Sequence, residues 1–308
     1  MPEAGFEFDA FRVAGLPRRA GVELARSLFR AGGAVRQGRR ILRRRGPDVV
    51  LGAGGFVGGP IVLAAASMRI PAALTEADAH LGLANRLAAP FAERVFLAYE
   101  LDGRRPPKYR VVGRPIPATS RPIGRDDARA KLGLPIDGRI LGVFGARAGA
   151  KSLSEHAVET WGRSGPVVLH ISGDRDYEEL RPRVARDDYF LVPTVEAFGT
   201  ALSAVDLALS RSGGTVWELA AAGLPAVLVP YPHATADHQL KNARHFERGG
   251  GAVVVLESEL RKTESLVESL LGDDARLGEM RKAMKSLSRE DAADRIAEEL
   301  IELAAARR

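Results

Sequence analysis

Short runs of consecutive valine, isoleucine and leucine alternate along the chain with longer segments of helical periodicity. Continuous apolar runs, rather than alternating ones, are typical of strands that a parallel sheet buries on both faces. Eleven segments have this character: FEFDAFRV (6–13), PDVVLGAG (47–54), IPAALTE (70–76), RVFLAYE (94–100), YRVVG (109–113), RILGVFG (139–145), PVVLHISG (166–173), YFLVP (189–193), DLALS (206–210), PAVLVPYP (225–232) and GAVVVLE (251–257).

A stretch rich in proline and charge, from Ile116 to Asp137, is predicted to be a loop that separates the first five runs from the last six. Because a helix-like or glycine-led segment follows each run, we predict an α/β protein with two doubly wound parallel-sheet domains. The domains would join near Pro117 and comprise residues 1–117 and 118–288.

The last segment, residues 289–308, begins like a capped helix. It places Ile296, Leu300 and Leu303 on one face, with acidic residues opposite. We expect this helix to pack back on the first domain.

The basic excess of the chain, which has 45 Lys and Arg against 39 Asp and Glu, is concentrated near one end. Between Leu16 and Arg45 ten arginines accompany one acid, Glu23. Apolar residues recur there at helical spacing, and Gly32, Gly33 and Gly38 are expected to divide the stretch into two helices. Two interpretations remain open, a solvated basic face and an attraction to an anionic membrane surface. Nucleic acid is not expected as a partner, because no recognition motif accompanies the arginines.

Other features of the sequence exclude several kinds of site and of protein. The chain has no cysteine, so disulfides and thiolate metal sites are excluded. MPEAGFEFDA carries acids where a signal peptide carries bases, so export by that route is not expected. The longest apolar run, PIVLAAASM, ends before Arg69 and is too short to span a bilayer.

Four glycine-rich or polar turns follow predicted strands, where ligands of such sheets bind: LGAGGFVGGP, FGARAGAKS, SRSGGT and PYPHATADHQLKNA. Any one of them is also an ordinary tight turn. SRSGGT is the most informative, because a helix beginning there exposes backbone N–H groups to an anion. Glu218, one turn further on, suggests a ligand with hydroxyls. FGARAGAKS fits neither the dinucleotide fingerprint nor the P-loop, yet its N–H groups, with Arg147 or Lys151, suit a phosphate.

Amide and imidazole groups gather in PYPHATADHQLKNA, namely His233, His238, Gln239 and Asn242. Such groups suit the recognition of sugar hydroxyls. A zinc site is the competing interpretation, which the spacing of the two histidines does not favour. The acids of GDRDYEEL, Asp174 and Asp176, are interpreted as a solvated helix cap rather than a metal site.

TEADAHLGLANR places Glu76, Asp78 and His80 just after a predicted strand. A carboxylate there suits a general base, and mutual repulsion between acids would tune it. The alternative is that Asp78 caps the following helix. Both readings stay open at this point.

The segments PDVVLGAGGFVGGP, TEADAHLGLANRLAAPFAERVFLA, SRSGGTVWELAAAGLPAVLVPYPHATADHQLKNA and GGGAVVV resemble, in order and spacing, those of the MurG family. The resemblance covers nearly the whole chain. It implies two Rossmann-like domains facing across a cleft, the B-type glycosyltransferase fold. It also implies transfer of N-acetylglucosamine from UDP-N-acetylglucosamine to an undecaprenyl-diphosphate-linked N-acetylmuramoyl-pentapeptide, with inversion and without metal or cofactor.

The resemblance assigns roles by position. Glu218 would bind the ribose, the backbone at Val195 would pair with uracil, and Gln239 with His238 would read the sugar hydroxyls. The diphosphate would lie on two turns, at Ser212, Gly213, Gly214 and Thr215 and at Ala146, Arg147 and Gly149. The acceptor side would be lined by Gly54, Gly55, Asp78 and Asn85, with Glu76 or Asp78 as the catalytic base.

The same resemblance implies a peripheral protein at the cytoplasmic face of the cell membrane, which the arginine-rich segment 16–45 would contact. Departures from the family accompany it, among them Asp78 in place of an amide residue. The initial strand and its GGTxGH loop have no counterpart, so the first domain is expected to be incomplete. Ala146 replaces a serine, and Pro117 replaces an arginine. A related glycosyltransferase with another lipid acceptor and an inactive nucleotide-sugar-binding fragment are the alternatives.

Overall fold

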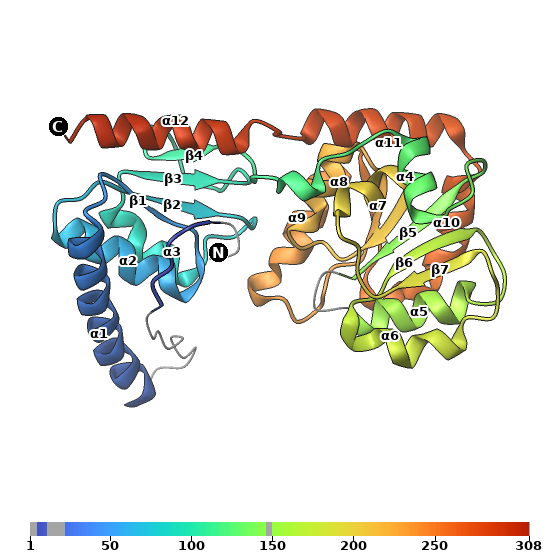
Figure 1. Ribbon diagram of the computed structural model, residues 1–308, viewed down its shortest axis with the longest axis horizontal. Coiled ribbons are helices and arrows are strands. Elements are labelled where there is room, and N and C mark those ends of the chain that lie inside the picture. The colour runs from blue at the N-terminus through green and yellow to red at the C-terminus, as the bar shows by residue number, and fades with distance from the viewer. Residues whose placement is uncertain (1–4, 11–21, 146–149, 308) are drawn as a thin grey trace. The chain divides into compact units, whose positions relative to one another are not determined.

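The computed structural model describes residues 5–10, 22–145 and 150–307. Residue contacts divide the chain into two compact units (Figure 1). The first unit comprises Met1–Arg114 with Asp291–Arg308, and the second unit comprises Pro115–Glu290. Each has a parallel sheet of its own.

The sheet of the first unit has the strand order β1-β2-β3-β4. Its strands are β1 Val50–Gly52, β2 Ala72–Glu76, β3 Arg94–Leu97 and β4 Tyr109–Val111. Helices α1 (Val22–Arg45) and α2 (Gly55–Ser67) cover one face. They are followed by α3 (Leu83–Ala88) and the short 3₁₀ helix η2 (Ala89–Phe91).

The other face of this sheet is covered by the last helix, α12 (Ala292–Ala305) (Figure 1). From this helix Ile296, Leu300 and Leu303 pack against Phe96 of β3 and Val112, which follows β4. The carboxylate of Glu299 adds ion pairs with Arg94 at 3.1 Å and with Arg110 at 3.4 Å. The apolar stripe of this helix thus completes the core of a sheet formed some 200 residues earlier.

One helix, not two, forms over residues 22–45, the described part of the arginine-rich segment, so the predicted break at its glycines is wrong. Gly38 lies where α1 crosses α2. A Cβ at Gly38 would come 3.0 Å from the Cβ of Ala64 and 3.3 Å from Cδ1 of Ile61. The glycine lets the two helices approach closely, and burial of Leu42 in the same interface offsets its low helix propensity.

The strand predicted at FEFDAFRV is also wrong for residues 6–10, which are irregular; the rest lies outside the described residues. Phe6 and Phe8 stay 68% and 62% exposed. The neighbouring acids, Glu7 and Asp9, pair instead with the basic end of α1: Glu7 with Arg45, and Asp9 with Arg44 and with Nε of Arg45 at 2.6 Å. The negative end of the helix dipole favours arginines in the last turn of a helix, and these arginines in turn attract the acids.

The sheet of the second unit has six parallel strands in the order β10-β9-β8-β5-β6-β7. They are β5 Ile140–Phe144, β6 Val167–Ile171, β7 Tyr189–Val192, β8 Leu207–Ser210, β9 Ala226–Leu228 and β10 Ala252–Val254. The chain moves outward from β5 to β7 and then returns to β8 on the other side of β5. This reversal is the topological switch point at which open α/β sheets bind ligands.

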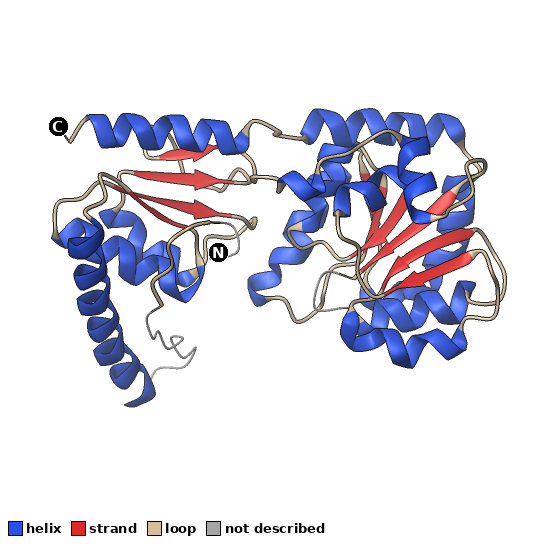
Figure 2. Ribbon diagram, viewed as in Figure 1, coloured by secondary structure: helices blue, strands red, loops and turns tan. Residues whose placement is uncertain are grey.

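Helices cover both faces of this sheet (Figure 2). They are α4 Arg125–Leu132, α5 Lys151–Trp161, α6 Asp174–Leu180, α7 Phe198–Ala204, α8 Thr215–Ala222, α9 His238–Arg248, α10 Thr263–Leu271 and α11 Asp274–Leu287. Short 3₁₀ helices occur at Ala118–Ser120 (η3), Arg181–Arg183 (η4), Thr235–Asp237 (η5) and Glu257–Lys262 (η6). Ten of the eleven predicted strands therefore form, and each is parallel to its neighbours.

Helix α4 lies inside the segment predicted to be a loop. Its charged sequence, RDDARAKL, hides an inward face formed by Ala128 and Arg129. Arg129 is fully buried, donates from Nε to the carbonyl of Ala204 at 2.9 Å, and pairs with Asp206 at 2.8 Å. A buried, fully hydrogen-bonded arginine thus takes the place of an apolar residue on the inward face. Because the helix lacks an apolar stripe, its sequence pattern did not predict it.

Gly199, in the first turn of α7, offers a test of how η3 is held on the second unit. A Cβ there would lie 2.0 Å from the carbonyl oxygen of Arg121. Because backbone would have to move, we expect Gly199→Ala to lower the free energy of unfolding by about 1–3 kcal/mol. Gly278→Ala, at a helical glycine with open space around it, should instead raise it by up to about 1 kcal/mol.

Urea unfolding followed by tryptophan fluorescence measures this, since Trp161 and Trp217, the two tryptophans of the chain, both lie in the second unit. Equal unfolding midpoints for Gly199→Ala and the unaltered protein would show that the close approach is not required.

His170 on β6 predicts an acid sensitivity of the same unit. It is fully buried, its Nδ1 lies 2.8 Å from the Tyr189 hydroxyl and its Nε2 lies 3.0 Å from Ser154 Oγ. Burial lowers the pKa of His170 from 6.5 to about 3. Between these values the unfolded chain binds a proton that the folded protein does not. This contribution therefore leaves stability intact above pH 6.5 and reduces it on acidification, by at most about 1.4 kcal/mol per pH unit.

We expect His170→Gln to lose stability at neutral pH yet to show a flatter decline between pH 6 and 4, measured as the urea midpoint at each pH. His233→Gln, at an exposed position, is the matched control and should keep the unaltered slope. If the urea midpoint declined with the same slope in all three proteins, the acid sensitivity could not be attributed to His170.

Candidate functional site

A cavity of about 560 Å³ lies at the carboxyl ends of the strands of the second unit, around the switch point between β5 and β8. Residues from four strand-to-helix connections line it: Gly145, Ala150, Lys151, Ser152 and Glu155 after β5, Arg175 after β6, Ser210, Arg211, Gly213, Gly214 and Thr215 after β8, and Tyr231 and Gln239 after β9. Three of the four turns singled out in the sequence therefore meet at one place.

The turn before α8 is held by its neighbours rather than by its own hydrogen bonds. Ser212 is fully buried and donates from Oγ to the carbonyl of Gln239 at 2.8 Å. Its own carbonyl accepts from Nδ2 of Asn242 at 3.1 Å. The amides of Val216 and Trp217 already donate within the turn. Within the described part of the chain, those of residues 213–215 have no acceptor and line the cavity.

Gln239 and His238 begin α9 beside that turn. The side-chain carbonyl of Gln239 accepts from the backbone N–H of Tyr231 at 3.0 Å. Its Nε2 lies 3.8 Å from the position of a Cβ on Gly213, so the NH₂ group lies beside this turn. Nδ1 of His238 is 2.8 Å from the carbonyl of Thr235, which orients the ring. The described residues contain no group of three side chains suited to a metal ion.

The sequence reasoning missed Arg211, which forms the floor of the cavity. Its side chain is buried and donates to the carbonyl of Val229 at 3.2 Å and to Ser152 Oγ at 2.8 Å. It also pairs with Glu257 and lies 5.7 Å from the ring centroid of Tyr231. Burial opposes ionisation of Glu257, but hydrogen bonds from Arg211 and Ser152 prevail and lower the pKa of that carboxyl. An arginine directly after an apolar strand was the available signal.

Two more cations line the cavity. Arg175 donates from Nε and Nη2 to Asp176 at 2.7 and 2.9 Å. Lys151 lies 2.9 Å from Glu179. The solvated-cap interpretation is wrong for Asp176, whose side chain is buried and whose pKa is lowered chiefly by the hydrogen bond from Arg175. It serves to orient a basic residue on the cavity wall.

Other residues that were predicted to bind the nucleotide sugar lie outside this cavity. Glu218 is one helical turn beyond Thr215, half-buried, and accepts a hydrogen bond from Ser120 Oγ; it does not line the cavity. Val195 is half-buried in the segment between β7 and α7 and does not line the cavity either. The predictions for Ala146, Arg147 and Gly149 lie outside the described residues.

The predicted acceptor residues of the first unit come together at the ends of β1 and β2. Glu76 ends β2, and Oε1 accepts from the N–H groups of Ala77 at 3.1 Å and Asp78 at 3.4 Å. Oε2 accepts from the N–H of Gly82 and from Nδ2 of Asn85, at 2.8 and 2.9 Å. Both oxygens are therefore engaged in ordering the loop. This arrangement favours a structural role for Glu76 over that of a free base.

Gly54 and Gly55, at the start of α2, both have positive φ angles, of 76° and 66°. A Cβ on Gly54 would lie 3.9 Å from Nδ2 of Asn85. Asn85 is 97% buried, yet its Oδ1 has no partner among the described residues. A buried acceptor without a donor is costly, so this oxygen is suited to a donor from a ligand. Asp78 is half-buried in the same loop.

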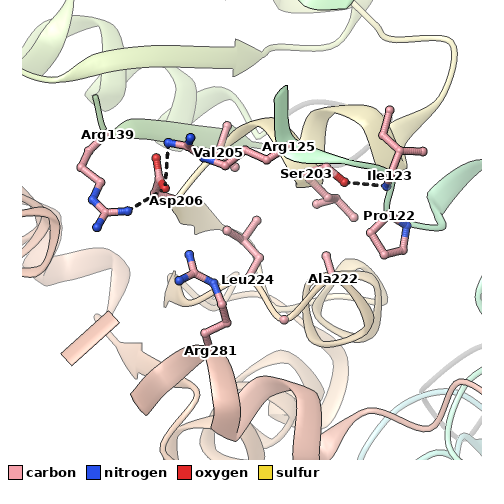
Figure 3. A pocket seen from close by; sticks show the side chains of 12 residues that line it. Pro122, Ile123, Arg125, Arg139, Ser203, Val205, Asp206, Ala222, Leu224 and Arg281 are labelled. Atoms are coloured by element: carbon pink, nitrogen blue, oxygen red, sulfur yellow. Dashed lines mark hydrogen bonds and ion pairs between the residues drawn. The ribbon is translucent and has the colours of Figure 1, made fainter. Parts of the chain in front are cut away.

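A second cavity, of about 260 Å³, lies at the amino ends of the central strands β5 and β8, and Figure 3 shows the side chains that line it. Arg125, Arg139 and Asp206 stand on its wall, and Asp206 accepts from Arg139 at 3.0 Å and from the N–H of Ile140 at 2.9 Å. Arg125 donates to the carbonyl of Gly138 at 3.1 Å. These residues lie before β5 and β8, on the side of the sheet where helices end. The arginines there donate to backbone carbonyls and to a buried acid, so their role is structural.

Among the described helices, none has both the length and the apolar character that crossing a bilayer requires.

The two parallel α/β units and their site at a switch point define the class of protein with the B-type glycosyltransferase fold, as predicted. The model of the glycosyltransferase family 28 N-terminal domain matches residues 1–97, and that of the C-terminal domain matches residues 142–297. The chain therefore belongs to glycosyltransferase family 28. Its relatives place it, within that family, in the MurG family predicted from its motifs.

The relatives that place it there bear the name UDP-N-acetylglucosamine–N-acetylmuramyl-(pentapeptide) pyrophosphoryl-undecaprenol N-acetylglucosamine transferase. That of Halothermothrix orenii is 36% identical over 94% of this chain and 83% of its own length. That of Mycobacterium bovis is 37% identical over 96% and 76%. Among solved structures, Acinetobacter baumannii MurG has a TM-score of 0.72 at 25% identity, covering 90% of this chain and 79% of its own.

The role of Glu76 in ordering the 77–85 loop is testable by hydrogen exchange. Glu76→Gln replaces one acceptor oxygen by an NH₂ group that faces N–H donors. We expect this loss to cost about 1–3 kcal/mol locally and to accelerate amide exchange in peptides covering residues 77–85. Glu93→Gln, at an exposed carboxylate of the same unit, is the control and should leave exchange unchanged. Undiminished protection in Glu76→Gln would refute the role.

Proposed function

We propose that this chain transfers N-acetylglucosamine from UDP-N-acetylglucosamine to an undecaprenyl-diphosphate-linked N-acetylmuramoyl-pentapeptide, with inversion at the anomeric carbon. Membership of the MurG family and the names of its relatives support the reaction. The observation that carries the proposal is the set of amides at residues 213–215, which have no acceptor among the described residues and line a cavity large enough for part of a nucleotide sugar.

The donor pyrophosphate would bind at the start of α8. Bare N–H groups and the positive end of the helix dipole favour an anion there. Lys151 and Arg175 add positive charge on the same cavity wall. The NH₂ group of Gln239, fixed through its carbonyl, would donate to a hydroxyl of the sugar, with His238 beside it.

The uridine would extend beyond the cavity. Glu218, a carboxylate with acceptor capacity left, would take the ribose hydroxyls, and the backbone near Val195 would pair with uracil.

In the reaction the acceptor hydroxyl would attack the anomeric carbon as the bond to UDP breaks. The electron pair of that bond leaves with UDP, where the amides of residues 213–215 stabilise the added negative charge. Asp78, the other acid of this segment, would take the hydroxyl proton. Gly54, Gly55 and Oδ1 of Asn85 would bind the acceptor.

The lipid acceptor calls for a membrane contact, and the first unit offers one. Leu83, Leu87 and Phe91, on α3 and η2, are 44%, 52% and 54% exposed beside exposed Arg86. Three arginines end α1 within the arginine-rich segment 16–45. Exposed apolar residues with nearby arginines suit an anionic membrane surface, so we place the protein at the cytoplasmic face of the cell membrane.

Glu218→Ala tests the donor assignment by calorimetric titration with UDP-N-acetylglucosamine. A hydrogen bond to a charged group contributes about 1.5–3 kcal/mol, so we expect affinity to fall about 10- to 150-fold. Glu178→Ala, at an exposed acid of the same unit, should bind as the unaltered protein does. Unchanged affinity in Glu218→Ala, with intact thermal unfolding, would contradict the assignment.

A further inference from the structure

We propose that Ser120 is a positioning residue for Glu218, whose hydroxyl fixes the carboxylate in the orientation that receives the ribose of the donor. The inference rests on the proposed function and adds to it a residue that no motif indicates. It concerns the connecting segment that begins the second unit, outside the strand ends where nucleotide contacts are expected.

The contact is direct and buried. Ser120 is the last residue of η3, is 3% exposed, and donates from Oγ to Oε1 of Glu218. Within the described residues, this is the one side-chain hydrogen bond that Glu218 makes. The orientation of the carboxylate therefore depends on a hydroxyl located 98 residues earlier in the chain.

The hydroxyl is itself held rigidly. The backbone N–H of Ser120 donates to the carbonyl of Pro117 at 2.9 Å, which closes the turn. The next residue, Arg121, lies so close to α7 that only a glycine fits at position 199. Two residues further on, the N–H of Ile123 donates to Ser203 Oγ at 2.9 Å. The segment is thus fastened to α7 on the far side of Ser120.

Such an anchor matters for binding because a glutamate side chain has several rotamers. A ligand that has to select one of them loses part of its binding free energy to ordering the side chain. Ser120 occupies one acceptor position on Oε1 and leaves Oε2 available. An ionised carboxylate has about four such positions, so a pair of vicinal ribose hydroxyls still finds acceptors.

A hydrogen bond with a merely structural role would affect the stability of the fold and not the affinity for the ligand. Affinity for UDP, measured by calorimetry for a set of four proteins, separates the two: the unaltered chain, Ser120→Ala, Glu218→Ala and the double variant. We expect Ser120→Ala to weaken binding about 3- to 10-fold and to have no further effect once Glu218 is replaced.

A second, independent test changes the ligand instead of Glu218. If Ser120 acts through the carboxylate on the ribose, its replacement should not weaken binding of 2′,3′-dideoxyuridine diphosphate, which lacks both hydroxyls. In turnover, KM for UDP-N-acetylglucosamine should rise by the same 3- to 10-fold with kcat unchanged. Thr119→Ala, which removes an exposed hydroxyl from the same short helix, is the matched control and should alter none of these values.

The outcomes are distinct. Failure of the unaltered protein to bind UDP would overturn the proposed function itself. If the unaltered protein binds UDP and Ser120→Ala binds it equally well, the positioning role is wrong. Equal losses for Ser120→Ala in the presence and absence of Glu218, or on the dideoxy ligand, would likewise overturn it, because the serine would then act through the fold.

Discussion

At the start of α8 the second unit holds three backbone amides for which the described residues provide no acceptor, and the turn that carries them is the constraint around which the site is built. Bare amides are costly when buried, and this protein maintains them by fixing the turn from outside. Ser212 is bonded to the backbone of α9, and Asn242 of that helix bonds back to it. Because the turn cannot rearrange to satisfy its own N–H groups, an anion is the partner that removes the cost. The cations on the surrounding wall favour the same ligand.

The sheet topology explains why the remaining groups gather there. Reversal of strand order at β5 and β8 leaves a space at their carboxyl ends that helices from both sides surround. Residues far apart in sequence, such as Lys151, Arg175 and Gln239, therefore share one cavity. The first unit follows the same rule on a smaller scale, since Gly54, Glu76 and Asn85 meet where β1 and β2 end.

The apolar runs predicted nearly all of the sheet strands because a strand buried on both faces has one requirement, a continuous run of apolar residues. The motif turns likewise pointed to Gly213, Gly214 and Gln239, which line one cavity; their roles in binding stay predictions. What failed were features that depend on tertiary partners. Gly38 is a helix breaker by propensity, but in the fold it is a contact point between helices. Arg129 and Arg211 are charged residues that look solvent-exposed in the sequence and are buried with full sets of partners. Ser120 carries no local signal, since its role arises from a residue 98 positions away.

The most direct measurement is a crystal structure of the protein with UDP bound. The pyrophosphate should lie within hydrogen-bond distance of the backbone N–H groups of residues 213–215, with the ribose hydroxyls on Glu218. A nucleotide bound elsewhere, with those amides facing only solvent, would contradict the account.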